Sequence, residues 1–174
     1  RGLKLHSDAP IQADSSDVQQ AVQALSTSAP DAIIMITAGA PTVTFIKAYR
    51  KVSRAARFYT TSVMGSQSTI QALGSDGVGV VVTSVVPFPW SHSLPVAREY
   101  RAVLKKAGME ESVSFIGLEA YINAKVLVEG LRRAGKDLTR PRFIQALESL
   151  QHFDVGGFEV DYGKGVRQGS RFVD

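Results

Sequence analysis

The sequence predicts an α/β fold in which a parallel sheet is sandwiched by helices. Two observations indicate this class. In residues 15–86, short apolar runs rich in Ile and Val alternate with amphipathic segments. Only a few small or polar residues join each apolar run to the amphipathic segment that follows it. Strands that alternate with helices in this order pair in parallel and need right-handed crossovers.

The first half is predicted to contain three helices and three strands. A helix over 15–29 opens with Ser16 and Gln19, which have the spacing of a capping box. The strand over 32–37 (AIIMIT) has no polar alternation, which is typical of a strand covered on both faces. The other predicted elements are a helix from Pro41, a strand over 57–61, a helix over 67–73 and a buried strand over 78–86. The apolar faces of the two longer helices are Val18, Ala21, Val22 and Leu25, and Phe45, Ile46, Tyr49 and Val52.

The second half begins with a break in regular structure, because the valine run stops at Pro87 and the residues Pro-Phe-Pro-Trp follow. Helices are predicted over 95–107, over 116–134 and from Thr139. Their apolar faces are Val96, Tyr100, Val103 and Leu104; Ala120, Ala124, Leu127, Val128 and Leu131; and Phe143, Leu147 and Leu150. The last segment is predicted to form two short strands around a Gly-Lys-Gly turn.

The composition is that of a globular domain, with 174 residues, 44% hydrophobic and 21% charged. No apolar run approaches the roughly 20 residues that a bilayer span needs. The formal charge of +4 comes from basic residues near predicted helix ends, where the helix dipole favours cations, so no nucleic-acid partner is predicted. The chain starts at Arg1 without a signal peptide and stops within an expected strand, which predicts a fragment or a processed product.

No catalytic, metal-binding or cofactor-binding pattern is present in the sequence, so an enzyme is not predicted. The chain has no cysteine, and His6, His92 and His152 are far apart without metal-ligand spacing. There is no Gly-x-Ser-x-Gly elbow, and the glycine-rich stretch at 74–79 precedes a strand, where a dinucleotide-binding loop would follow one.

Two loops are candidate ligand-binding sites, because ligands of open α/β sheets bind outside the carboxyl ends of the strands. The first contains Thr37, Ala38, Gly39 and Ala40, whose small size gives a ligand access to backbone amides at a helix start. The second contains Thr61 and Ser62, whose hydroxyls suit a polar small molecule. The alternative is that both loops are well-formed turns with local caps and bind no ligand.

Four residues of the second half are further candidates. Phe88 and Trp90 form either a plug that completes the core or a wall against which a ligand stacks. Phe115 and Glu119 lie at the start of the long predicted helix. Helix electrostatics alone also explain an acidic residue at that end.

The order of these parts resembles a known family. The phrases "VVPFPW", "SFIGLEAYINAKVLVEGLRRAG", "LTRPRFIQALESL" and the terminal "GSRFVD" occur in that order. Together they are similar to the C-terminal half of the branched-chain amino-acid-type periplasmic substrate-binding proteins of ABC transporters, which have the type I periplasmic-binding fold. The resemblance covers essentially the whole chain and implies two α/β lobes, joined by hinge crossings, that close around a small ligand.

The resemblance also implies a division of the chain and a set of partners. Residues 1–86 would be part of the second, ligand-binding lobe, 87–93 a hinge crossing, 94–152 helices of the first lobe, and 153–174 the return crossing and terminal hairpin. The implied function is that of a periplasmic solute-binding component of an ABC transporter, without cofactors. It would bind a small organic solute, either amino-acid-like or an organic or aromatic carboxylate, in the cleft between the lobes. Its partners would be a small-molecule ligand, a membrane permease and the missing N-terminal portion of the same protein. The alternative function is the ligand-sensing domain of a receptor or regulator with the same fold.

The sequence departs from this family at two places. Amino-acid-binding members carry an acidic residue that contacts the ligand's ammonium group in the loop after the second strand, and an aromatic residue before Pro41. This chain has Ser62 and Ala40 there. An ammonium group buried without a carboxylate partner is costly. The departure therefore favours a carboxylate, or another neutral to anionic organic compound, over a standard branched-chain amino acid.

Overall fold

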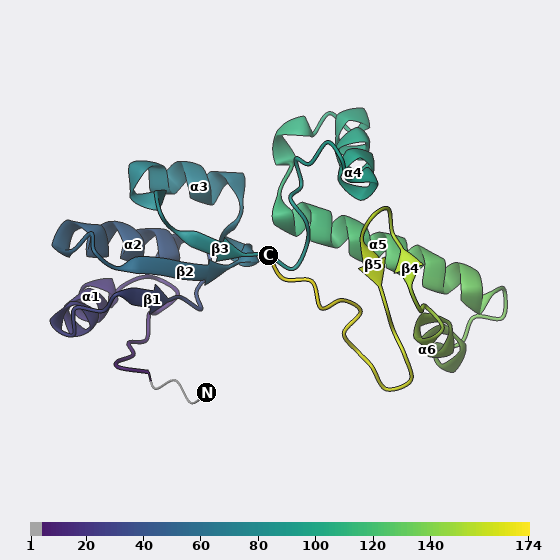
Figure 1. Cartoon of the computed structure of the whole chain (residues 1–174), viewed down its shortest axis with the longest axis horizontal. Helices are drawn as coiled ribbons and strands as arrows, with labels where there is room; N and C mark the ends of the chain where they lie inside the picture. The colour runs from purple at the N-terminus through teal and green to yellow at the C-terminus, as the bar shows by residue number, and fades with distance from the viewer. Residues whose placement is uncertain (1–4) are drawn as a thin grey trace. The chain divides into compact units, whose positions relative to one another are not determined.

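A computed structural model describes residues 5–174 of the chain (Figure 1). It divides after Thr83 into two compact units. The boundary precedes the predicted crossing over 87–93, so that segment lies within the second unit. No helix in the described part is long and apolar enough to cross a membrane.

The first unit is a three-stranded parallel sheet with helices between its strands (Figure 1). The strands are β1 (Ala32–Ile34), β2 (Arg57–Thr61) and β3 (Val81–Thr83), in the order β1-β2-β3. The helices are α1 (Val18–Thr27), α2 (Ala40–Val52) and α3 (Gln67–Leu73), with 3₁₀ turns over Ser62–Met64 and Gly74–Gly77. The predicted alternation of strands and helices is thus confirmed.

The core of the first unit lies on one face of this sheet. Three aromatic rings form its centre: Phe58 of β2 packs edge-on against Phe45 and Tyr49 of α2, with ring centroids 6.3 and 5.7 Å apart. The other buried apolar residues come from all three helices, from β1 and from the positions just after β1 and just before β2. They are Val18, Ala21, Val22, Ile33, Met35, Ile46, Ala56 and Leu73. One sheet face is therefore sealed by α1, α2 and α3.

The opposite sheet face is open within this unit. Ile34, Tyr59 and Val81 are register partners on neighbouring strands, so their side chains form one row across this face. Ile34 is 68% exposed and Ile36, two residues further on, is 81% exposed. The prediction that the 32–37 strand is covered on both faces is wrong for this unit, because the run alternates between the core and the open face.

Several predicted details of the first unit are also wrong. Helix α1 begins at Val18, not near Ser16, because the preceding residue Asp17 is its N-cap and the Asp17 carboxylate accepts a hydrogen bond from the Gln12 amide. Of the strand predicted over 78–86, only the part that forms β3 pairs with β2, and the residues of β3 are exposed. Val52, predicted to be buried, is exposed at the end of α2.

The second unit consists of three helices and a short hairpin (Figure 1). The helices are α4 (Pro95–Lys106), α5 (Phe115–Ala134) and α6 (Arg140–Glu148), with a 3₁₀ turn over Glu110–Ser112. Strands β4 (Phe153–Asp154) and β5 (Glu159–Val160) pair antiparallel. The hairpin turns at Gly156–Gly157, not at the predicted Gly-Lys-Gly. The reason is that the Asp154 carboxylate accepts hydrogen bonds from both glycine amides, at 2.8 and 2.6 Å.

The first and last residues of this unit are hydrogen-bonded to each other. The Ser84 amide donates to the Asp174 carbonyl at 2.8 Å, and the Asp174 amide donates to the Ser84 carbonyl at 2.9 Å. These two hydrogen bonds join the backbone at the start of the second unit to the backbone at its last residue.

Helix α5 buries a different face from the predicted one. Its buried positions are spaced by four residues and are Leu118, Ile122, Val126 and Gly130. The predicted residues Leu127 and Val128 are exposed in this unit. A methyl group at Gly130 would lie 2.6 Å from Leu147 Cδ2 and 3.0 Å from Phe143 Cε2 of α6. The missing side chain at Gly130 therefore allows α6 to approach α5 closely, and this approach selects the face that is buried.

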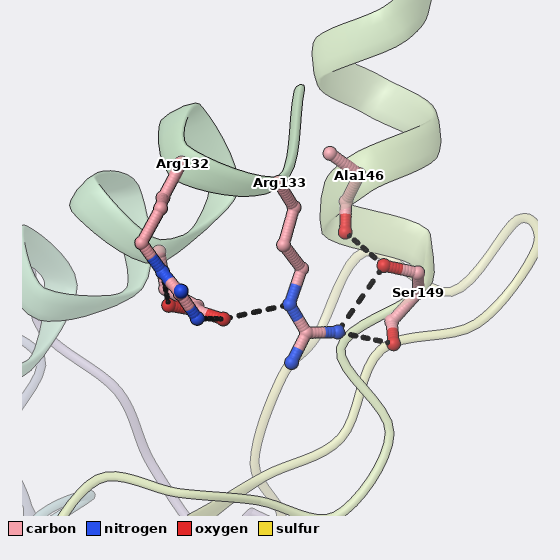
Figure 2. Close-up of polar contacts among 5 residues, drawn as sticks. Arg132, Arg133, Ala146 and Ser149 are labelled. Carbon is pink, nitrogen blue, oxygen red and sulfur yellow. Dashed lines mark hydrogen bonds and ion pairs between the residues drawn. The ribbon is translucent and has the colours of Figure 1, made fainter. Parts of the chain in front are cut away.

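A charged network joins the ends of α5 and α6 (Figure 2). The carboxylate of Glu129 accepts hydrogen bonds from Arg132 Nε at 2.8 Å and from Arg133 Nε at 2.7 Å. The other side of the Arg133 guanidinium donates to the Ser149 carbonyl at 2.8 Å, just beyond the end of α6. Arg133 therefore connects the Glu129 carboxylate to the C-terminus of the neighbouring helix, where backbone carbonyls favour a cation.

This network predicts a pH dependence of stability. Hydrogen bonds from Arg132 and Arg133 lower the pKa of Glu129 from 4.5 to about 2. Because the pKa in the folded state lies below that in the unfolded state, the stabilisation is complete above about pH 4.5 and is lost as the pH falls to about 2. We expect the urea midpoints of the wild type and Glu129→Gln to differ at neutral pH and to converge towards pH 2. Glu111→Gln, at an exposed site, serves as the control. A midpoint difference that stays constant with pH would contradict this assignment.

Candidate functional site

The two candidate loops of the first unit lie at the same edge of its sheet. Strands β1 and β2 are parallel neighbours, and the Met35 amide extends their pairing by donating to the Tyr59 carbonyl at 2.8 Å. The loop with Thr37, Ala38, Gly39 and Ala40 follows β1, and Thr61 and Ser62 end β2 and begin the next turn. The fold therefore brings these residues to one sheet edge, as parallel pairing requires.

The start of α2 is open to a ligand. Its N-cap is Gly39, at φ 65°, and no side chain caps the helix. Ala38, Gly39 and Ala40 are exposed. Pro41 has no amide hydrogen, so few backbone donors are available in the first turn. This end of the helix is electrostatically suited to a small anionic group.

Two hydroxyl groups meet at this helix start, and a third lies near the end of β2. The Thr37 and Thr42 hydroxyls lie 2.6 Å apart, and Thr42 is fully buried. The Thr60 hydroxyl is buried one residue before the end of β2 and has no hydrogen-bond partner among the described residues. Thr42 was not predicted as a candidate, since a threonine within a helix has no distinctive sequence signal.

The candidate loops carry no charged side chain. No Asp, Glu, Lys or Arg occurs within 32–46 or within 58–75. Ser62 is half-buried at the place where the family resemblance implies an acidic residue. The loops therefore offer hydroxyls and backbone amides to a ligand and no carboxylate.

Three of the four candidates of the second unit lie close together. Phe88, Trp90 and Phe115 form a cluster, which we call the aromatic cluster, with ring centroids 5.2 to 6.2 Å apart. Glu119 lies one helical turn beyond Phe115 on α5. Its side chain lines a cavity of about 130 Å³ together with Val85, Val86 and Ile122.

The aromatic cluster combines features of both predicted alternatives. Pro89 is fully buried, and Trp90 and Phe115 pack against the core of the unit. Phe88, by contrast, is 55% exposed. Trp90 therefore packs as the predicted plug, together with Pro89, whereas Phe88 presents a ring to the surface.

The comparisons with known proteins agree with this architecture. The sequence profile of the periplasmic binding protein family matches residues 1–171. The chain belongs to this family. The family and the fold class predicted from the sequence are thereby confirmed.

Solved structures of family members are similar over nearly all of this chain. A possible leucine/isoleucine/valine-binding protein from Rhodopirellula baltica SH 1 is 31% identical, with a TM-score of 0.84 over 92% of this chain and 44% of that chain. A substrate-binding periplasmic protein from Ralstonia solanacearum is 30% identical, with a TM-score of 0.81 over 93% of this chain and 47% of that chain. No curated protein sequence matches. The chain spans less than half of the length of these structures.

A more distant structure shares the fold. It is a branched chain amino acid ABC transporter protein from Thermus thermophilus with bound valine, 17% identical, with a TM-score of 0.77 over 91% of this chain and 46% of that chain.

Proposed function

We propose that the full-length protein is the solute-binding component of an ABC transporter. It acts in the periplasm, binds a small organic solute without changing it chemically, and delivers it to a membrane permease. The observation that supports this proposal is the family match over residues 1–171, together with neighbours described as substrate-binding or leucine/isoleucine/valine-binding proteins.

The ligand in this proposal is an organic carboxylate. The start of α2 and the hydroxyls of Thr37, Thr61 and Ser62 are suited to an anionic or neutral polar group. Neither loop has a carboxylate to pair with an ammonium group. Burying the ammonium group of an amino acid at these loops would leave that charge without a partner, at a large cost in binding free energy.

Further polypeptide of the same protein covers the two open apolar faces in this proposal. One is the sheet face with Ile34, Tyr59 and Val81, and the other is the exposed side of α5 with Leu127 and Val128. The chain covers less than half of the solved structures that it matches, which supports this assignment.

A matched pair of ligands tests the proposed ligand class. Leucine and 4-methylpentanoate share one carbon skeleton and a carboxylate and differ only in the ammonium group. In titration calorimetry on the full-length protein, we expect 4-methylpentanoate to bind about tenfold or more tightly than leucine, because the ammonium group would be buried without a partner. We expect Ser62→Asp to reverse this order.

The control for this experiment is Ser75→Asp, which adds a carboxylate before β3, away from the candidate loops. This variant is expected to keep the wild-type order of the two ligands. Tight leucine binding by the wild type, with no response to carboxylates, would refute the proposed ligand class.

A further inference from the structure

Two buried hydroxyl groups lie in the otherwise apolar layer between the sheet and the start of α2. Thr42 is fully buried in the first turn of this helix, and Thr60 of β2 is 3% exposed. The core around them is apolar and includes Met35, Phe45 and Phe58. A buried hydroxyl costs free energy unless it is hydrogen-bonded. Departures from packing rules are expected mainly at functional sites, so these two hydroxyls point to a site here.

The hydrogen bond between Thr37 and Thr42 has a preferred direction. The two oxygens are 2.6 Å apart, and either hydroxyl can donate. Thr42 has no other hydrogen-bond partner in the described part of the chain, so its hydrogen can be used only towards Thr37. If Thr37 donated instead, the Thr42 hydrogen would be buried without an acceptor, at a cost in free energy. Thr42 is therefore the donor, and the half-buried Thr37 keeps its own hydrogen for another acceptor.

The Thr60 hydroxyl lies at the same level as the first turn of α2. Phe58 contacts Phe45 and Tyr49 of α2, and Thr60 is two residues further along the same face of β2. Helix α2 follows β1 and runs back along the sheet, so its first turn lies at the carboxyl ends of the strands. Two strand residues span about 6.6 Å, and the five helical residues from the middle of 45–49 back to Thr42 span about 7.5 Å. The Thr60 hydroxyl, which has no partner within residues 5–174, therefore faces the start of α2.

These groups are complementary to a negative charge. Gly39 leaves the start of α2 without a side-chain cap, and this end of a helix favours an anion. A hydroxyl donates a stronger hydrogen bond to a charged acceptor than to a neutral one. A hydroxyl without a fixed partner can also turn its dipole towards a nearby charge. Thr37 and Thr60 therefore both stabilise an anionic group at this helix start.

We propose that Thr37 donates a hydrogen bond to the carboxylate of the solute, and that Thr42 is a positioning residue that fixes the direction of this donor. Thr60 stabilises the same carboxylate from the layer below, through the dipole of its unpaired hydroxyl. All three residues belong to the first unit. This inference rests on the proposed function, which requires a carboxylate at these loops and gives no role to Thr42 or Thr60.

The matched probes are 4-methylpentanoate and 4-methylpentanamide, which share a carbon skeleton and a carbonyl oxygen and differ in charge. In titration calorimetry on the full-length protein, we expect Thr42→Val to weaken binding of the carboxylate about 3- to 10-fold and binding of the amide by less. Thr42→Ser keeps the hydroxyl and should restore the wild-type affinity. Thr60→Val should weaken binding of the carboxylate in the same selective way.

A double-mutant cycle separates positioning from packing. Thr37→Val removes the donor itself, so adding Thr42→Val to it should cause no further loss of affinity. If Thr42 only filled space in the core, its substitution would weaken binding equally with and without Thr37. The control is Thr27→Val, which removes an exposed hydroxyl that donates to the Gln23 carbonyl. Thr27 ends α1 before β1 begins, at the other edge of the sheet, so both affinities should stay unchanged.

Urea denaturation of the unbound full-length protein gives a second readout. Thr60→Val replaces an unpaired buried hydroxyl by a methyl group of the same shape, so the urea midpoint should rise while the affinity for the carboxylate falls. A purely structural role of Thr60 would not produce this opposite movement of stability and affinity.

The outcomes separate this inference from the proposed function. An unchanged carboxylate affinity in Thr42→Val or in Thr60→Val, while the wild type binds 4-methylpentanoate, would overturn the inference and leave the proposed function intact. Equal losses for the carboxylate and the amide would overturn it as well. Binding of leucine alone, or of no carboxylate, would overturn both the inference and the proposed ligand class. A selective loss in Thr42→Val that Thr42→Ser restores, and that is absent once Thr37 is replaced, would support the inference.

Discussion

Phe58→Ala is expected to lower the free energy of unfolding of the first unit by about 3–5 kcal/mol. Phe58 is 0% exposed and packs edge-on against Phe45 and Tyr49. The Arg50 guanidinium lies 4.9 Å from the centroid of its ring. Truncation to alanine leaves a cavity under α2 and removes all of these contacts. Urea denaturation followed by circular dichroism measures the change.

The control for Phe58→Ala is Val78→Ala, because the Val78 side chain is exposed. This substitution is expected to change the free energy of unfolding by no more than about 0.5 kcal/mol. A loss below about 1 kcal/mol for Phe58→Ala would contradict the assignment of the aromatic trio as the centre of the core.

The second large effect is expected on the open sheet face. In residues 1–174 alone, Ile34→Asp should leave the free energy of unfolding nearly unchanged, because Ile34 is solvent-exposed there. In the full-length protein the same substitution should cost about 3 kcal/mol or more, because it would bury an unpaired charge under the covering polypeptide. Urea denaturation of both proteins with and without the substitution gives the comparison.

Dye binding tests the same proposal independently. Residues 1–174 alone should bind a hydrophobic dye at the exposed apolar faces, and the full-length protein should not. A sharp, monomeric thermal transition of residues 1–174 without dye binding would contradict the proposal that further polypeptide covers these faces. An equal, small effect of Ile34→Asp in both proteins would contradict it as well.

The sequence was sufficient to predict the order of strands and helices, but not which faces are covered. The alternation of apolar runs with amphipathic segments identified β1, β2, α2 and α3 because hydrophobic periodicity is a local signal. Periodicity could not distinguish the buried Ile33 from the exposed Ile34, because this apolar run has no polar residue that would mark an uncovered face. Helix α5 has apolar residues on more than one side, and the approach of α6 at Gly130 selects the side that is buried.

The candidate site was predictable only in part. Placing the loops after β1 and β2 at one edge follows from parallel pairing, which the strand order predicts. The meeting of Phe88 with Phe115 depends on how the chain folds after Pro89, and no local pattern carries that information. Arg101, which donates to the carbonyls of Pro89 and Ser91, was overlooked for a related reason: backbone carbonyls have no sequence signature.

The reciprocal backbone pair between Ser84 and Asp174 has a consequence for engineering. Since the two ends of the second unit meet at adjacent points, this segment forms a closed loop in space. A proline at position 84 or 174 would remove one of the two amide donors, so an engineered variant should keep both residues non-proline.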